Sequence, residues 1–196
     1  MIKTSSPIIL ASKSPRRKKL LKLLNIKFRT LEVHLDEDIP EQEDPADSVK
    51  RLSVEKLALA REKVKKGIII TADTIVVLDN HVLGKPADKK DAVRMLNLLS
   101  GRTHTVYTGF SIYNSQTGRT ITDLQKTAVT FRTLGQHEIE EYVDGGSPMD
   151  KAGAYGIQDD FGAVFVEKIS GCYYNVVGLP LSRLYRDLIK ITNTDL

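Results

Sequence analysis

Apolar residues occur in short runs and at helical spacing along the chain, a pattern that predicts interleaved strands and helices. Residues 8–10, Ile-Ile-Leu, form a continuous apolar run that favours a short buried strand. Ser14-Pro15 then supplies an N-cap followed by proline at the first helical position, so we expect a helix over residues 15 to about 24. Asp44-Pro45 repeats this signal and predicts a longer helix that reaches about residue 66.

The middle of the chain has the apolar content and length of strands. Residues 68–70 and 75–78 are apolar on both sides of Ala72-Asp73-Thr74, so we expect strand around an interruption. A helix is predicted over residues 88–99, where Val93, Leu96 and Leu99 share a face. Similar signals predict an extended stretch at 28–35, strands at 103–113 and 120–133 around a turn at 114–118, a helix at 136–143, a strand at 164–169 and a final helix from Pro180.

This order of elements predicts an α/β fold with a mixed sheet. Strands and helices interleave, but the two long neighbouring strands in the middle favour an antiparallel portion over a purely parallel, doubly wound sheet. We find no internal repeat or low-complexity tract. Since 196 residues suffice for one sizeable domain, or two lobes that share a core, residues 1–196 are expected to form a single domain.

Composition and charge narrow the class of protein. With 41% hydrophobic and 28% charged residues, the chain has the usage of an ordinary globular protein. A formal net charge of +4, spread along the chain, fits an anionic ligand such as a nucleotide. A nucleic-acid-binding module is the weakest alternative, because aromatic residues make up 6% of the chain and Trp is absent.

The cysteine count and the first residues bear on location. Cys172 is the lone cysteine and cannot form an intramolecular disulfide, which favours a reducing compartment. The apolar run at residues 8–11 is far too short for a signal peptide or a membrane span. We therefore expect a cytoplasmic protein with no membrane partner.

Four cations occupy residues 16–19, in the first turn of the first predicted helix, where the helix dipole disfavours positive charge. A bound anion would explain them, because backbone N–H groups, the Ser12 and Ser14 hydroxyls, and the side chains of Arg16 and Arg17 would converge on phosphate oxygens. The alternative is a solvated basic turn capped by Ser14. This feature alone leaves both interpretations open.

Asp73 is the most informative acidic residue, because a carboxylate within an interior strand is costly unless it is paired or holds a metal. It is therefore a candidate metal ligand or general base, with the hydroxyl of Thr74 beside it. The alternative, an Asx turn at the end of a strand, is disfavoured because apolar residues resume at once. Asp36, Glu37 and Asp38 form a second acidic cluster, and one of them could share a divalent cation with Asp73. The alternative for this cluster is a solvated loop.

Two lysines and a glycine-rich segment are further candidates for ligand contacts. Lys56 falls inside the apolar arc of the long helix, so it must either snorkel to solvent or meet an anion. Lys85, between Gly84 and Pro86, suits a fixed phosphate contact, the alternative being an ordinary loop lysine. Residues 150–158 combine small residues, which let a ligand approach the backbone, with Asp, Lys and Gln, whose side chains can form hydrogen bonds with the polar edges of that ligand. The P-loop, dinucleotide and zinc-protease motifs are absent.

The candidate segments, taken together in their order along the chain, resemble the Maf family of nucleoside triphosphate pyrophosphatases over roughly residues 8 to 186. The resemblance implies a fold similar to the inosine triphosphate pyrophosphatases, with an elongated mixed sheet flanked by helices, two lobes around a cleft, and frequent homodimers. It rests on Leu-Ala-Ser-Lys-Ser-Pro-Arg-Arg-x-x-Leu-Leu from residue 10, Asp36-Glu37, Glu55-Lys56, Ala72-Asp73-Thr74, Gly84-Lys85-Pro86, residues 150–158 and Gly178-Leu179-Pro180-Leu181.

The resemblance also implies a reaction and a set of residues. Such an enzyme hydrolyses a nucleoside triphosphate between its α and β phosphates, with a divalent metal such as magnesium or manganese, and releases a nucleoside monophosphate and pyrophosphate. The catalytic residues would be Asp73, Glu37 and Lys56, with Asp73 as the base and Glu37 and Asp73 as metal ligands. Ser12, Arg17, Lys56 and Lys85 would grip the phosphates.

Within the family, the sequence is similar to the subgroup that acts on dTTP and UTP. Arg16, Thr74 and Gln158 would be its specificity residues. Asp159-Asp160 departs from the pattern, since relatives often place Gly there, and adds negative charge near the expected base pocket. The alternatives are the sister subgroup that acts on 7-methyl-GTP, and a nucleotide-binding regulator of cell division, or septum formation, that needs no turnover.

Overall fold

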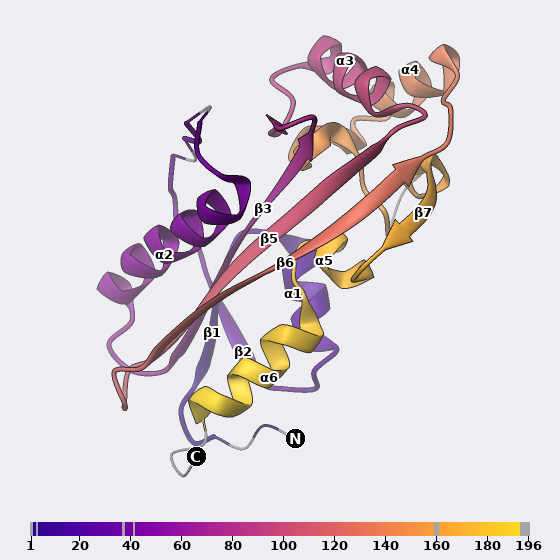
Figure 1. The fold of residues 1–196 in the computed structure, drawn as a ribbon. Helices are drawn as coiled ribbons and strands as arrows, with labels where there is room; N and C mark the ends of the chain where they lie inside the picture. The colour runs from indigo at the N-terminus through magenta and orange to yellow at the C-terminus, as the bar shows by residue number, and fades with distance from the viewer. Residues whose placement is uncertain (1, 3, 37, 41, 159–160, 193–196) are drawn as a thin grey trace. The chain divides into compact units, whose positions relative to one another are not determined.

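A computed structural model describes residues 2, 4–36, 38–40, 42–158 and 161–192 (Figure 1). Its longer helices and its strands follow the pattern expected from the sequence. In chain order the elements are β1 (Ile8–Ala11), α1 (Pro15–Lys22), β2 (Phe28–Leu31), α2 (Pro45–Lys63), β3 (Ile68–Leu78), β4 (His81–Leu83), α3 (Lys89–Leu99), β5 (Thr103–Asn114), β6 (Thr120–Phe131), α4 (Gln136–Asp144), the 3₁₀ turns η1 (Ser147–Asp150), η2 (Ala152–Ala154) and η3 (Phe161–Phe165), β7 (Val166–Ser170), α5 (Tyr173–Val177) and α6 (Leu181–Thr192).

The strands form a seven-stranded mixed sheet in the order β2-β1-β3-β5-β6-β7, with β4 paired to β3. β1 lies parallel to both β2 and β3, with Leu10 opposite Thr30 on one side and Ile70 on the other. β4 and β7 pair antiparallel with β3 and β6 respectively. The predicted mixed α/β fold is therefore confirmed. Among the residues that the structure describes, no helix is long and apolar enough to cross a membrane.

The chain divides into two compact units. Unit 1 comprises Met1–Asp73, Thr108–Gln125 and Gly178–Leu196, and unit 2 comprises Thr74–Tyr107 and Lys126–Val177. The strands β3, β5 and β6 contribute residues to both units. The division in β3 falls between Asp73 and Thr74, so two neighbouring candidate residues belong to different units.

The core of unit 1 lies between α2 and the strands β1, β3 and β5. β1 is buried along its whole length, and a cluster around Ile9 and Ile69 includes Leu57 and Ala60 from α2. Gly109 in β5 allows a very close approach of α2, because a Cβ atom there would lie 2.3 Å from the carbonyl oxygen of Val49. The backbone of α2 is thus held directly against the sheet.

The core of unit 2 is aromatic. The rings of Phe131, Phe165, Tyr142 and Tyr155 pack mostly edge to face, with centroids 4.7 to 6.0 Å apart. His104 on β5 joins this cluster, its ring 5.0 Å from Phe131. These contacts hold the segment that follows α4 against the sheet.

Three details differ from the expectations. β3 is one continuous strand through Asp73, so the predicted interruption at residues 72–74 is wrong. The reason is that the buried carboxylate has a cationic partner and the strand need not break. The last strand begins at Val166 rather than 164, because a 3₁₀ turn occupies Phe161–Phe165, and the short helix α5 had no sequence prediction.

Candidate active site

A buried ion pair joins Lys56 of α2 to Asp73 of β3. The pair is formed by Nζ of Lys56 and Oδ1 of Asp73, and the two residues are 8% and 4% exposed. Lys56 therefore meets an anion and does not snorkel to solvent. Asp73 is not part of a turn, since strand continues on both sides of it.

Stability alone does not account for such a pair. Burying two charges costs several kcal/mol of hydration per ion, and apolar residues of similar volume are often as stable. Charged groups that are buried and specifically paired are instead concentrated at functional sites. The Lys56–Asp73 pair is therefore the centre of the candidate active site.

A chain of hydroxyl groups braces α2 against the sheet beside this pair. Ser53 Oγ lies 2.8 Å from Ser111 Oγ on β5, and Thr71 Oγ1 on β3 donates a 2.7 Å hydrogen bond to the Ser53 carbonyl. Ser53 precedes Lys56 by one helical turn, and Thr71 lies two residues before Asp73, on the same face of the strand. Sequence reasoning missed these hydroxyls, although small hydroxyl residues among apolar strand positions were a visible signal.

The start of α1 is organised by its serines. Ser14 is the N-cap and accepts a 3.3 Å hydrogen bond from the backbone N–H of Arg17, while its own N–H donates to Ser12 Oγ at 3.2 Å. Ser12 and Arg16 are half-buried. The proposed capping at residues 14 and 15 is therefore confirmed, and the cap orients Ser12 at the end of β1.

Arg17 connects this helix start to the residue before Asp73. Its Nη1 donates to the carbonyl of Ala72 at 2.9 Å, and its Nε donates to the carbonyl of Gly178 at 2.8 Å. Its guanidinium group is therefore fixed in orientation beside β3. Unit 1 thus brings together Arg17, Asp73 and Lys56, with Ser12 at the neighbouring strand end.

The remaining described candidates lie in unit 2. Thr74 is half-buried in β3, Lys85 is exposed on the bend after β4, and Gln158 is half-buried after η2. The Gly153 N–H donates to the Gly84 carbonyl at 2.9 Å, so the segments that carry Lys85 and Gln158 are joined within this unit. Their proposed roles stay predictions.

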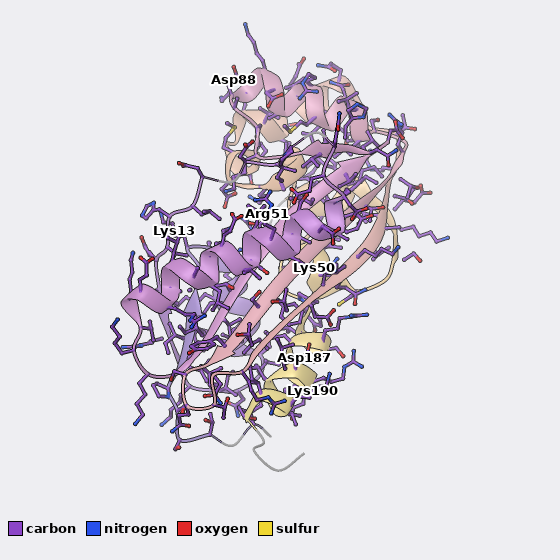
Figure 2. The ribbon with its side chains drawn as sticks, turned by 60° about the vertical axis from the view of Figure 1, so that its left-hand side comes forward. Lys13, Lys50, Arg51, Asp88, Asp187 and Lys190 are labelled. Atoms are coloured by element: carbon purple, nitrogen blue, oxygen red, sulfur yellow. The ribbon has the colours of Figure 1, made fainter. Side chains whose placement is uncertain are left out.

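The second acidic cluster is described only in part, because Glu37 lies outside the described residues, as do Asp159 and Asp160. Asp36 and Asp38 are exposed. Arg51, labelled on α2 in Figure 2, donates to the carbonyl of Asp38 at 2.9 Å and to both carboxylate oxygens of Glu43. This hydrogen bonding holds the pKa of Glu43 below its usual value. Arg51 therefore anchors the loop before α2.

A divalent cation prefers oxygen donors, and the described part of this site offers the carboxylate of Asp73. Within the described part of the chain, no group of three or more His, Cys, Asp or Glu side chains could hold a metal. Magnesium in nucleotide sites is usually bound by one or two carboxylates, with water and phosphate oxygens completing its shell. The carboxylate of Asp73 fits that mode of binding, in which the nucleotide supplies part of the coordination.

Comparison with known proteins shows the family of this chain. A family model described as Maf-like protein matches residues 7–191. The chain belongs to the Maf family, and the resemblance seen in its motifs is confirmed.

Individual relatives cover nearly the whole chain. A protein of Bacillus cytotoxicus named dTTP/UTP pyrophosphatase is 47% identical over 180 residues, which are 92% of this chain and 93% of the relative. Proteins with the same name from Desulforamulus reducens and Bacillus cereus are 44% and 46% identical over 178 and 181 residues, again 93% of each relative. The match of the family model to residues 7–191 includes every candidate segment.

Proposed function

We propose that this chain is a nucleoside triphosphate pyrophosphatase, a hydrolase of acid anhydrides, that converts dTTP and UTP to the nucleoside monophosphate and pyrophosphate. The observation that carries the proposal is the buried pair of Lys56 and Asp73, with the guanidinium of Arg17 fixed beside it. Relatives of nearly equal length that are named dTTP/UTP pyrophosphatase support the choice of substrate.

Asp73 is proposed as the general base. Its carboxylate accepts a proton from water, the water oxygen forms a bond to the α phosphorus, and the bond from this phosphorus to the bridging oxygen breaks. The electron pair of that bond leaves with pyrophosphate. Lys56 keeps Asp73 ionised before the reaction, since a nearby cation favours the charged form of a carboxylate.

Positive charge has to balance the triphosphate, which carries three to four negative charges at neutral pH. Arg17 and Lys56 supply fixed cations, and Ser12 supplies a hydroxyl donor at the end of β1. Asp73, together with Glu37, is proposed to hold magnesium or manganese, which when bound would neutralise phosphate charge and acidify water. Lys85 is proposed as a further phosphate contact.

Recognition of the base is proposed to involve Arg16, Thr74 and Gln158, whose side chains can donate or accept hydrogen bonds. The proposal also includes a cytoplasmic location, which the lone Cys172 supports, and a homodimer. A role in septum formation is a further part of the proposal. No nucleic-acid or membrane partner is part of the proposal.

Pyrophosphate release from a panel of triphosphates tests this function. We expect wild-type protein, with magnesium or manganese, to hydrolyse dTTP and UTP faster than dATP, dGTP and 7-methyl-GTP. Hydrolysis of 7-methyl-GTP alone would contradict the proposed specificity. Absence of turnover with every triphosphate, combined with tight nucleotide binding, would favour the regulator of cell division.

A further inference from the structure

The segment that leads to Gln158 is held in unit 2 by backbone and side-chain contacts at three places. The Gly153 N–H donates to the Gly84 carbonyl at 2.9 Å, and the Gly156 N–H donates to the Tyr142 hydroxyl at 3.2 Å. Between them, the hydroxyl of Tyr155 lies 2.8 Å from Nε2 of His104. The chain immediately before Gln158 is therefore fixed to β5, to α4 and to the loop of Lys85.

The backbone of this segment is in a conformation that has to be held. Gly153 has φ = +69° and Ala154 has φ = +61°, so two consecutive residues are left-handed. Alanine rarely adopts this conformation, because its Cβ crowds the following carbonyl oxygen. Such a conformation persists only where surrounding contacts enforce it, and in proteins it is concentrated at ligand sites.

The contact between His104 and Tyr155 is buried. The two residues are 2% and 6% exposed, and both rings pack against Phe131. Burial lowers the pKa of His104 to about 4, so the imidazole is neutral at physiological pH. The contact is therefore a neutral hydrogen bond inside an aromatic cluster.

This arrangement carries a cost that a purely structural core would avoid. His104 Nδ1 is buried without a hydrogen-bond partner in the described structure. An apolar pair at these positions would leave no polar atom unsatisfied. His104 and Tyr155 thus form a directional hydrogen bond at a position where an apolar pair would have a lower free-energy cost.

We propose that His104 and Tyr155 are a positioning pair that fixes the 150–158 segment and thereby sets the affinity of the enzyme for the nucleoside end of its substrate. This inference rests on the proposed function, in which Gln158 contacts the base. The pair acts through the segment and touches neither the water nor the phosphorus. Its loss is therefore expected to change KM and to leave kcat nearly unchanged.

Steady-state kinetics with dTTP on Tyr155→Phe test the pair. Loss of one hydrogen bond corresponds to a factor of about three to ten in an equilibrium constant, so we expect KM to rise about three- to tenfold with kcat within about twofold of wild type. Thr127→Val is the matched control, because Thr127 Oγ1 is also a buried hydrogen-bonding group of unit 2, bonded to Cys172 and Asn175. The control should lower Tm without a change in KM.

The double variant His104→Leu/Tyr155→Phe separates positioning from stability. Both polar partners are removed, so Tm is expected to recover relative to Tyr155→Phe alone. KM is expected to stay raised, because the directional contact is still absent. A KM that recovers in parallel with Tm, or that never rises in Tyr155→Phe, would overturn the inference.

Amide hydrogen exchange gives a second readout that needs no turnover. We expect exchange at residues 153–158 to accelerate at least about tenfold in Tyr155→Phe, while α2 exchanges as in wild type. Unchanged exchange in the segment would overturn the inference even if the enzyme is active. Accelerated exchange in a protein that hydrolyses no pyrimidine triphosphate would contradict the proposed function alone.

Discussion

Unit 1 buries a lysine and an aspartate as an ion pair, whereas unit 2 buries a histidine and a tyrosine as a neutral pair. Lys56 and Asp73 are both less than a tenth exposed, and so are His104 and Tyr155. The ion pair lies beside a fixed guanidinium group and a row of hydroxyls, while the neutral pair lies among aromatic rings. The two pairs are thus buried to a similar extent, but one is charged and the other is neutral.

The difference shows what each pair can do. A buried ionised carboxylate can accept a proton, and a buried ammonium can balance phosphate charge, so the pair in unit 1 is suited to chemistry. A neutral hydrogen bond between aromatic side chains can do neither at physiological pH. It can hold a backbone segment in place, which is the role that we infer for the pair in unit 2.

Lys56→Met is expected to cause the largest loss of stability. It leaves Asp73 buried without this cation, and breaking a buried ion pair usually costs about 3–5 kcal/mol. Chemical denaturation should show this loss in the free energy of unfolding. The double variant Lys56→Met/Asp73→Asn should regain much of it, because the buried negative charge is gone as well. A loss below about 1 kcal/mol in the single variant would mean that the pair is not the charged centre of unit 1.

Acid should destabilise the protein through His104. Burial lowers the pKa of this histidine to about 4, from 6.5 for an ordinary imidazole, so the folded form binds a proton more weakly than the unfolded chain does. The contribution of the neutral His104 to the free energy of unfolding is fully present above pH 6.5. It decreases as the pH falls toward 4, by up to about 3 kcal/mol.

The measurement is the free energy of unfolding between pH 7 and pH 4, in wild type and in His104→Gln. The glutamine does not titrate, so the difference between the two proteins isolates the histidine from the other acidic and basic groups. The free energy of unfolding of the wild type should fall more steeply than that of His104→Gln between pH 7 and pH 4. Parallel curves would show that the buried imidazole is not the titrating group.

Gly109→Ala should disturb the pair in unit 1 from a distance. Its Cβ would lie 2.3 Å from the Val49 carbonyl oxygen, so the backbone of α2 must move. Overpacking of this kind typically costs about 1–3 kcal/mol, and the shift of Lys56 should also lower kcat. Gly84→Ala is the matched control for stability, since no atom lies within 4 Å of a Cβ built there. Equal Tm values for the two variants would contradict the close approach of α2.

Glu138→Gln should have the smallest effect. Hydrogen bonds from Arg132 and from the Gly135 backbone lower the pKa of Glu138 to about 2, but the pair lies at the surface, with the Glu138 side chain 24% exposed. Exposed ion pairs contribute about 1 kcal/mol or less, so thermal melting should change by a few degrees at most. A loss as large as that of Lys56→Met would remove the contrast between buried and exposed pairs.

The sequence predicts local features well, since their causes are local. The caps at Ser14 and Asp44 and the prolines after them set the starts of α1 and α2, and these predictions are confirmed. The sequence also identifies Lys56 and Asp73 as anomalies, because each puts a charge among apolar neighbours.

The sequence does not predict what depends on contacts between distant residues. It could not pair Lys56 with Asp73, since that pairing depends on how α2 packs on β3, and so it placed an interruption where the strand is continuous. The hydrogen bond between His104 and Tyr155 was missed for the same reason, because the two residues are separated by 51 positions along the chain. Neither residue departs from its local pattern enough to stand out.

The most direct test of the account is the rate of pyrophosphate release from dTTP by Asp73→Asn. The substitution keeps the shape of the side chain and an oxygen that can accept from Lys56, but removes the proton acceptor. We predict a fall in kcat of about 10²–10⁴-fold in folded protein, with a Tm below that of wild type, because the buried ammonium of Lys56 loses its charged partner. Asp144→Asn, which changes an exposed carboxylate of unit 2 paired with Lys89, serves as the control and should retain full activity. Hydrolysis by Asp73→Asn within a few-fold of wild type would contradict the claim that the buried pair is the catalytic centre.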